Sequence, residues 1–205
     1  MIRAVLGGSF DPVHRGHVAV VERLLHDGLA DEVRLVPVGI PPHRSPPLAS
    51  GPDRVAMLEV VFKDLPGTAV DDREIRRAGP SFTVDTLAEL TAAYPADRWR
   101  LVVGADHLDG FGRWRNPQRI LDLADLIVFR RGRGPGGGRA EGLHEIHRVL
   151  AASGLTGHRI HWVDDFDEPV SSAVVRVMLD NGIDAGDSLP PAVGAYIAAH
   201  GLYRT

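Results

Sequence analysis

The sequence predicts an α/β fold, a doubly wound parallel sheet with a small helical part at its C-terminal end. Short apolar runs alternate along the chain with amphipathic stretches of helical period. Strand, helix and strand repeated in this order are typical of a parallel sheet with right-handed crossovers. The 205 residues suffice for one sizeable core, so we expect a single domain over residues 1–205.

The predicted strands are short and apolar, as expected for strands that are buried on both faces. They are residues 2–6, 33–38, 101–103 and 126–129, with weaker candidates at 69–70 and 160–163. Periodicity predicts helices at about residues 16–28, 51–62, 83–94, 117–123, 141–152, 171–181 and 190–200. Prolines in residues 39–52 and glycines in residues 130–142 predict two irregular connections.

The composition excludes several classes of protein. A net charge of -4 argues against a general affinity for nucleic acid or anionic membranes. The lack of cysteine excludes disulfides, thiolate metal sites and cysteine nucleophiles, and it fits a reducing compartment. Lys63 is the one lysine, which argues against a P-loop or a Schiff base. Because the sequence carries no long apolar segment, we expect a cytoplasmic protein, and a homo-oligomer is compatible with these features.

The first predicted strand runs into the stretch GGSFDPVHRGH, residues 7–17, where a doubly wound fold would bind a ligand. Gly8 lets the backbone approach a ligand closely, and Ser9 adds a hydroxyl group. A helix is expected to begin near Gly16, with its first N–H groups facing the loop. His14 and His17 then share one face of the helix. Two imidazoles at a helix N-terminus suit a phosphate chain; the alternatives are a metal pair, or histidines used as caps and in packing.

A second candidate anion site lies in VSSAVVRVML, residues 170–179. Ser171 or Ser172 can cap a helix and offer a hydroxyl group to an anion, and Arg176 follows about one turn later. A Ser-capped amphipathic helix without a ligand is the alternative. Together with the two histidines, this segment favours a clamp for the β- and γ-phosphates of a nucleotide.

Both segments resemble motifs of the nucleotidylyltransferases, a family with a Rossmann-like fold. GSFDPVHRGH is similar to the element G-(T/S)-F-D-P-x-H-x-G-H, and VSSAVVRVML is similar to I-S-S-T-x-I-R. The resemblance implies that His14 and His17 contact the ATP phosphates and stabilise the charge that develops at the α-phosphorus. It places Phe10, with Ser9, beside the nucleotide. Ala173 stands where threonine is usual, so one hydroxyl contact is missing or is supplied by Ser172.

Four further segments resemble bacterial nicotinate-nucleotide adenylyltransferases, and they occur in the same order. They are PPHR (41–44), REIRRAGPSFTVDTL (73–87), GADHLDGFGRWRNPQRIL (104–121) and LPPAVGAYIAAHGLYR (189–204). The resemblance implies adenylyl transfer from ATP to nicotinate mononucleotide, with deamido-NAD and pyrophosphate as products. It also implies Mg²⁺ bound with ATP and no metal ligand from protein side chains. Nicotinamide mononucleotide or phosphopantetheine as acceptor, or a non-catalytic nucleotide-sensing module, are the alternatives.

The residues of these segments suit a pyridine mononucleotide. Trp114 offers a flat face for stacking, Arg115 beside it is a candidate anion ligand, and Phe82 and Thr83 begin a helix whose N–H groups suit a carboxylate. Taken singly, Trp114 also fits a core or lid position and Thr83 an ordinary helix cap.

The remaining candidates follow the predicted strands at residues 33–38 and 101–103. Arg44, with His43 beside it, lies on a proline-stiffened loop and could grip the phosphate of the mononucleotide. Gly104 and Asp106 follow a strand, at a place where a carboxylate often contacts a ribose hydroxyl. Arg44 also fits a solvated surface position, and Asp106 a turn.

Overall fold

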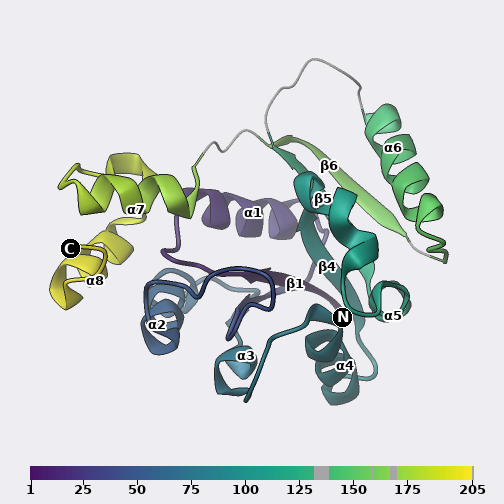
Figure 1. Cartoon of the computed structure of the whole chain (residues 1–205), viewed down its shortest axis with the longest axis horizontal. Helices are drawn as coiled ribbons and strands as arrows, with labels where there is room; N and C mark the ends of the chain where they lie inside the picture. Colours follow the sequence, from purple (N-terminus) through teal and green to yellow (C-terminus); the bar gives the residue numbers. More distant parts are fainter. Residues whose placement is uncertain (132–138, 158, 167–169, 205) are drawn as a thin grey trace. The chain divides into compact units, whose positions relative to one another are not determined.

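The computed structural model describes residues 1–131, 139–157, 159–166 and 170–204. Within these ranges, six strands form a sheet with the order β3-β2-β1-β4-β5-β6 (Figure 1). The pairs β1–β4, β2–β3, β4–β5 and β5–β6 are all parallel. Because the strand order changes direction at β1, the sheet is doubly wound, and the predicted α/β class is confirmed.

The strands are β1 (Ile2–Gly8), β2 (Glu32–Pro37), β3 (Thr68–Val70), β4 (Arg98–Gly104), β5 (Asp125–Arg131) and β6 (Ile160–Phe166). The α-helices are α1 (Arg15–His26), α2 (Gly51–Phe62), α3 (Arg73–Arg76), α4 (Thr83–Ala93), α5 (Pro117–Leu123), α6 (Arg139–Ala152), α7 (Ser172–Asp180) and α8 (Pro191–His200). Two 3₁₀ helices are η1 (Ala105–Arg113) and η2 (Gly186–Ser188).

Every predicted strand and helix is present, with its ends shifted by a few residues. The two predicted irregular connections are shorter than expected. Residues 51–52 already belong to α2, because Ser50 caps that helix and proline is well tolerated in its first turn. Residues 130–131 end β5 and residues 139–142 begin α6, while residues 132–138 lie outside the described ranges. The ends of the predicted glycine-rich connection therefore belong to a strand, β5, and to a helix, α6.

The chain divides into two compact units, and the expectation of a single domain stays a prediction. The first unit comprises Met1–Leu6 and Phe82–Asp167, and the second comprises Gly7–Ser81 and Glu168–Thr205. In the described residues, no helix is long and apolar enough to cross a membrane.

The core of the first unit lies along β4 and β5. Leu126, Ile127 and Val128 have no exposed surface, and Leu101 and Phe129 are 3% exposed. Strands buried on both faces need such continuous apolar runs, which is why the sequence pattern located them. Helix α6 packs against β6, and α4 packs against α5 (Figure 1).

The core of the second unit joins β2 to the helices around it. Val33 and Leu35 of β2 and Met57 and Leu58 of α2 are fully buried. Val193 of α8 is also fully buried, and α8 packs against α2 (Figure 1). The C-terminal segment is thereby fixed within the same unit as the loop that follows β1.

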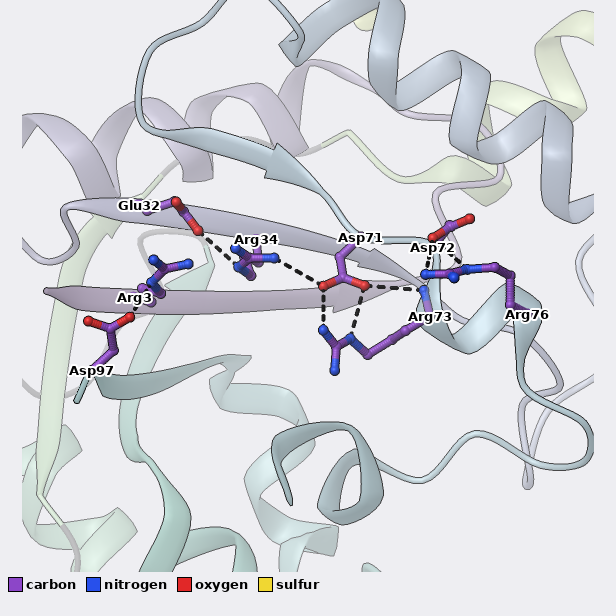
Figure 2. A network of polar contacts seen from close by, with 8 residues as sticks. All are labelled: Arg3, Glu32, Arg34, Asp71, Asp72, Arg73, Arg76 and Asp97. Atoms are coloured by element: carbon purple, nitrogen blue, oxygen red, sulfur yellow. Dashed lines mark hydrogen bonds and ion pairs between the residues drawn. The ribbon is translucent and has the colours of Figure 1, made fainter. Parts of the chain in front are cut away.

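A chain of ion pairs connects β2, β3 and α3 in the second unit, as Figure 2 shows. The Asp71 carboxylate accepts hydrogen bonds from Arg73 Nη2 at 2.8 Å and from Arg34 Nη1 at 3.2 Å. Arg34 in turn lies 2.9 Å from Glu32 through its Nε atom. The Asp71 backbone N–H donates to the carbonyl of Leu35, so the carboxylate is held at the end of β3. This network ties the short helix α3 to the sheet.

Candidate active site

The loop after β1 has an unusual backbone that is fixed by packing. Phe10 is fully buried and adopts a φ of 48°, and the Asp11–Pro12 peptide bond is cis. A Cβ atom added to Gly8 would lie 3.3 Å from the Phe10 ring. Glycine at this position therefore leaves space for the Phe10 ring. This packing is a structural reason for Gly8, in addition to the expected close approach of a ligand.

The two histidines lie together at the start of α1. His14 is the N-cap residue, and the centroids of the His14 and His17 rings are 3.7 Å apart with 26° between the planes. The backbone N–H of His14 donates to Nδ1 of His17 at 3.2 Å. A neutral imidazole that accepts at Nδ1 carries its proton on Nε2, so the His17 ring presents a donor on its other side. The histidines share one face, as expected, and the capping role that was an alternative is also present.

Gly16 is closely packed against the first of these histidines. A Cβ atom at Gly16 would lie 3.1 Å from the His14 ring, a tight contact, and 3.6 Å from the carbonyl oxygen of Val170, an ordinary one. Gly16 is itself buried. A side chain at this position would therefore press on the His14 ring.

The N-terminus of α7 contacts the loop that carries the histidines. Ser171 caps α7, and its Oγ accepts from the backbone N–H of Val174 at 3.3 Å. The Ser172 hydroxyl donates to the carbonyl of Pro12 at 3.0 Å. Arg176 donates through Nη1 to the carbonyl of Asp11 at 2.5 Å. The structure therefore brings the N-terminal and C-terminal motifs together within the second unit, although they are more than 150 residues apart in sequence.

Asp11 is the centre of this arrangement, and the sequence reasoning missed it. Its carboxylate is buried and accepts from the backbone N–H groups of Leu48 at 2.8 Å and Ala49 at 2.9 Å. The hydroxyl of Tyr203 donates to the same carboxylate at 2.7 Å. Burial raises the pKa of Tyr203, and the hydrogen bond to Asp11 raises it further. An Asp-Pro pair beside two histidines was the available signal, but its partners are distant in sequence.

Arg54 was also missed, and it supports the same loop from α2. Its side chain is buried, and it donates to the carbonyl oxygen of Ser9 at 2.9 Å and to that of Ala49 at 3.3 Å. Burial lowers the pKa of Arg54, while the charge of Asp11 opposes that shift. A buried cation beside the loop adds to the positive potential where a phosphate chain is expected. Ser9 itself is exposed.

His43 and Arg44 are exposed on the segment between β2 and α2 of the second unit. The base of this segment is closely packed: the backbone N–H of Gly39 donates to Ser81 Oγ at 3.2 Å, and a Cβ atom at Gly39 would collide with the carbonyl of Glu74. The same segment is anchored further on, where its backbone binds Asp11. The two candidate ligands therefore lie on an exposed stretch that is fixed at both ends.

The other residues expected to bind the acceptor substrate lie in the first unit. Phe82 is the N-cap of α4 and Thr83 is its first residue. The guanidinium of Arg115 lies 4.5 Å from the centre of the Phe82 ring, and its Nη1 atom lies 3.5 Å from the carboxylate of Asp85. Trp114 is half-buried, with its ring 5.1 Å from that of Phe111. It lies beside the core and keeps part of its surface exposed.

The end of β4 also has a defined geometry. Gly104 is its last residue, and a Cβ atom there would collide with the carboxylate of Asp106. Asp106 lies in the first turn of η1 and is exposed, with His107 Nδ1 at 3.4 Å. The helix η1 was not predicted, because its glycines obscure any helical period. Across the part of the chain that the structure describes, no three His, Asp or Glu side chains form a candidate metal cluster.

Comparisons with known proteins agree with this arrangement. A model of the cytidylyltransferase-like family matches residues 5–178. A protein of Aeromonas hydrophila named probable nicotinate-nucleotide adenylyltransferase is 39% identical over 209 residues, which cover 98% of this chain and 96% of that protein. A protein of Bordetella avium with the same name is 37% identical over 201 residues, which cover 98% and 96%.

The same fold is found among solved structures. The nicotinic acid mononucleotide adenylyltransferase of Plasmodium falciparum, solved in complex with NaAD, matches with a TM-score of 0.75 and 17% identity. The match covers 98% of this chain and 97% of that one. At 17% identity, the structural likeness supports only the fold. The family assignment rests on the family model and on the sequence relatives.

Proposed function

The chain belongs to the cytidylyltransferase-like family, and we propose that it is a nicotinate-nucleotide adenylyltransferase. The reaction transfers the adenylyl group of ATP to the phosphate of nicotinate mononucleotide, giving deamido-NAD and pyrophosphate. The observation that carries the proposal is the contact of α7 with the histidine loop, through Ser172 and Arg176. This contact collects two imidazoles, a guanidinium and a helix N-terminus in one unit, and those are the groups that bind a triphosphate.

The phosphates of ATP would be bound within the second unit. His14, His17 and Arg176 supply the donors for the phosphates, and Ser171 and Ser172 add hydroxyl groups at the N-terminus of α7. The backbone around the nucleotide would come from Gly8, Ser9, Phe10 and Gly16. Gly104 and Asp106 of the first unit are proposed to bind the ribose of ATP.

We propose a role in acceptor binding for each of the following residues, in the setting described above for its own unit. Arg44 and His43 are proposed to hold the phosphate of the mononucleotide. Trp114 stacks on the pyridine ring, and the N–H groups at Phe82 and Thr83 bind its carboxylate. Arg115, which lies over the Phe82 ring, supplies a positive charge beside that carboxylate.

The proposed chemistry needs no general base and no covalent intermediate. A phosphate monoester loses its second proton near pH 6, so the acceptor oxygen is ionised at neutral pH. That oxygen forms a bond to the α-phosphorus of ATP, while the bond from the α-phosphorus to the bridging oxygen breaks and its electrons leave with pyrophosphate. His14, His17 and Arg176 would neutralise the charge that builds up in this step. Mg²⁺ bound together with ATP would supply positive charge for the leaving pyrophosphate.

The test is pyrophosphate release in steady state, measured with ATP and each of three acceptors: nicotinate mononucleotide, nicotinamide mononucleotide and phosphopantetheine. We expect the highest kcat/KM with nicotinate mononucleotide, and loss of activity when EDTA removes Mg²⁺. A higher kcat/KM with one of the other acceptors would assign the chain a different reaction. ATP binding without pyrophosphate release for any acceptor would indicate a nucleotide-sensing module and overturn the proposal.

A further inference from the structure

Tyr203, near the C-terminal end of the sequence, contacts the loop that holds the histidines. Its hydroxyl donates to Oδ1 of Asp11 at 2.7 Å, and Asp11 precedes His14 by three residues. We propose that Tyr203 is a positioning residue for nucleotidyl transfer, which holds the Asp11 carboxylate so that the Arg176 guanidinium stays available to the phosphates of ATP. This inference rests on the proposed function, because it assigns Arg176 to ATP.

The hydrogen bonds of Asp11 show how neutral donors satisfy this buried carboxylate. Oδ1 accepts from the Ala49 N–H and from the Tyr203 hydroxyl, and Oδ2 accepts from the Leu48 N–H. An ionised carboxylate has about four acceptor positions, so three neutral donors satisfy most of its capacity. Arg176 Nη1 forms an ion pair with Oδ2 at 3.7 Å, a distance too long for a hydrogen bond. Its hydrogen bond goes to the backbone carbonyl of Asp11 instead.

Removal of the tyrosine hydroxyl would change this balance. A buried carboxylate that loses a donor gains strongly from a charged replacement. Arg176 is close enough to move onto the carboxylate, whereas Arg54 is already bound to the carbonyl groups of Ser9 and Ala49. A guanidinium that is hydrogen-bonded directly to the Asp11 carboxylate is a poorer ligand for phosphate than one held at ion-pair distance. The loss is therefore expected in ATP binding rather than in acceptor binding.

The experiment compares Tyr203→Phe with Tyr196→Phe as a matched control. Tyr196 lies in the same C-terminal segment, and its hydroxyl donates to a carboxylate of α2, Asp53 Oδ1, at 3.0 Å. We expect Tyr203→Phe to raise both the Kd and the KM for ATP by about tenfold, the effect of one hydrogen bond to a charged group, with the KM for the acceptor unchanged. Tyr196→Phe should leave all three values at the wild-type level.

A double-mutant cycle with Arg176→Ala separates positioning from general loosening of the fold. The Kd for ATP is measured by calorimetry for each single variant and for the double variant, after circular dichroism has verified that each is folded. In the Arg176→Ala background, Tyr203→Phe should have no further effect, because the side chain through which it acts is gone.

Three results would overturn the inference: wild-type affinity in Tyr203→Phe, effects that multiply in the double variant, or the same loss in Tyr196→Phe. These results differ from a failure of the proposed function, in which wild-type protein binds ATP but uses no acceptor. A wild-type protein that does not bind ATP would overturn both.

Discussion

At the scale of single residues, the two histidines combine a structural role with the proposed catalytic one. His17 accepts the backbone N–H of His14 and so satisfies one of the N–H groups at the start of α1. The same ring stacks on His14 and would offer Nε2 to a phosphate oxygen. Loss of His17 should therefore affect stability and turnover for different reasons, and the two can be measured separately.

Two substitutions of His17 are expected to give different results. His17→Ala removes the capping acceptor and the ring, so the free energy of unfolding should fall by about 1 kcal/mol. Its turnover should fall by about a thousandfold, since one phosphate donor is lost. His17→Asn keeps an acceptor near the Nδ1 position and should retain most of the stability, with turnover equally low. Urea unfolding and pyrophosphate release measure the two effects, and near-normal turnover in His17→Ala would remove the proposed role.

The sequence predicted contacts between residues that are close together in the chain, and it missed contacts between residues that are far apart in the chain. The spacing of His14 and His17 predicted one shared face, because it depends on a single turn of helix. Asp11 and Tyr203 are 192 residues apart, and nothing in either local pattern indicates their hydrogen bond. The same holds for Arg54, whose neighbours in α2 give an ordinary amphipathic pattern.

At the scale of elements, the start of α1 is closely packed at Gly16. Alanine is normally favoured over glycine inside a helix by about 1 kcal/mol. At Gly16, however, the added Cβ would lie 3.1 Å from the His14 ring. The ring would have to shift, and a shift in this proposed catalytic group would reduce turnover steeply.

We therefore expect Gly16→Ala to lower kcat by about tenfold or more, with only a small change in the free energy of unfolding. Gly194→Ala in α8 is the control, since nothing lies within 4 Å of a Cβ atom there. That variant should gain about 0.5 to 1 kcal/mol and keep its turnover. The measurements are steady-state kinetics and thermal unfolding. Equal turnover in the two variants would contradict the role given to the glycine.

The sequence located the helices and strands whose apolar residues follow a regular spacing. Helix α5 and helix α2 have the predicted bounds, because each begins with a proline in its first turn and carries clear apolar spacing. The four-residue helix α3 is too short to show a period, and it is held by Asp71 and Arg73 rather than by its own pattern.

At the scale of the whole molecule, the ion pairs of Figure 2 connect stability to pH. Burial raises the pKa of Asp71, but the hydrogen bonds and charge of Arg73, with Arg34, outweigh it and hold the pKa below its usual value of 3.8. A carboxyl whose pKa is lower in the folded state stabilises the fold above its unfolded pKa. That stabilisation is lost as the pH falls through the folded pKa.

Asp71→Asn is expected to lower the free energy of unfolding by about 2 kcal/mol at neutral pH, because two arginines lose a charged partner. The difference from wild type should begin to shrink as the pH falls below 3.8 and should be lost as the pH falls through the lower pKa of the folded state, where the wild-type carboxyl becomes protonated. Asp72→Asn is the control: Asp72 pairs with Arg76 on the surface, so its loss should change stability by less than about 0.5 kcal/mol. Urea unfolding at several pH values measures both, and a difference that persists in acid would contradict the assignment.

The sequence by itself determined the order of strands and helices along the chain and the two motifs that we propose bind phosphate. Both are local: apolar periodicity depends on neighbouring residues, and each motif lies within one loop and one helix turn. The tertiary structure decided which distant groups meet, namely Tyr203 with Asp11, Arg176 with the Asp11 carbonyl, and Arg54 with Ser9. These contacts depend on how the elements pack, since a buried carboxylate takes its donors from whatever segment the fold brings within about 3 Å.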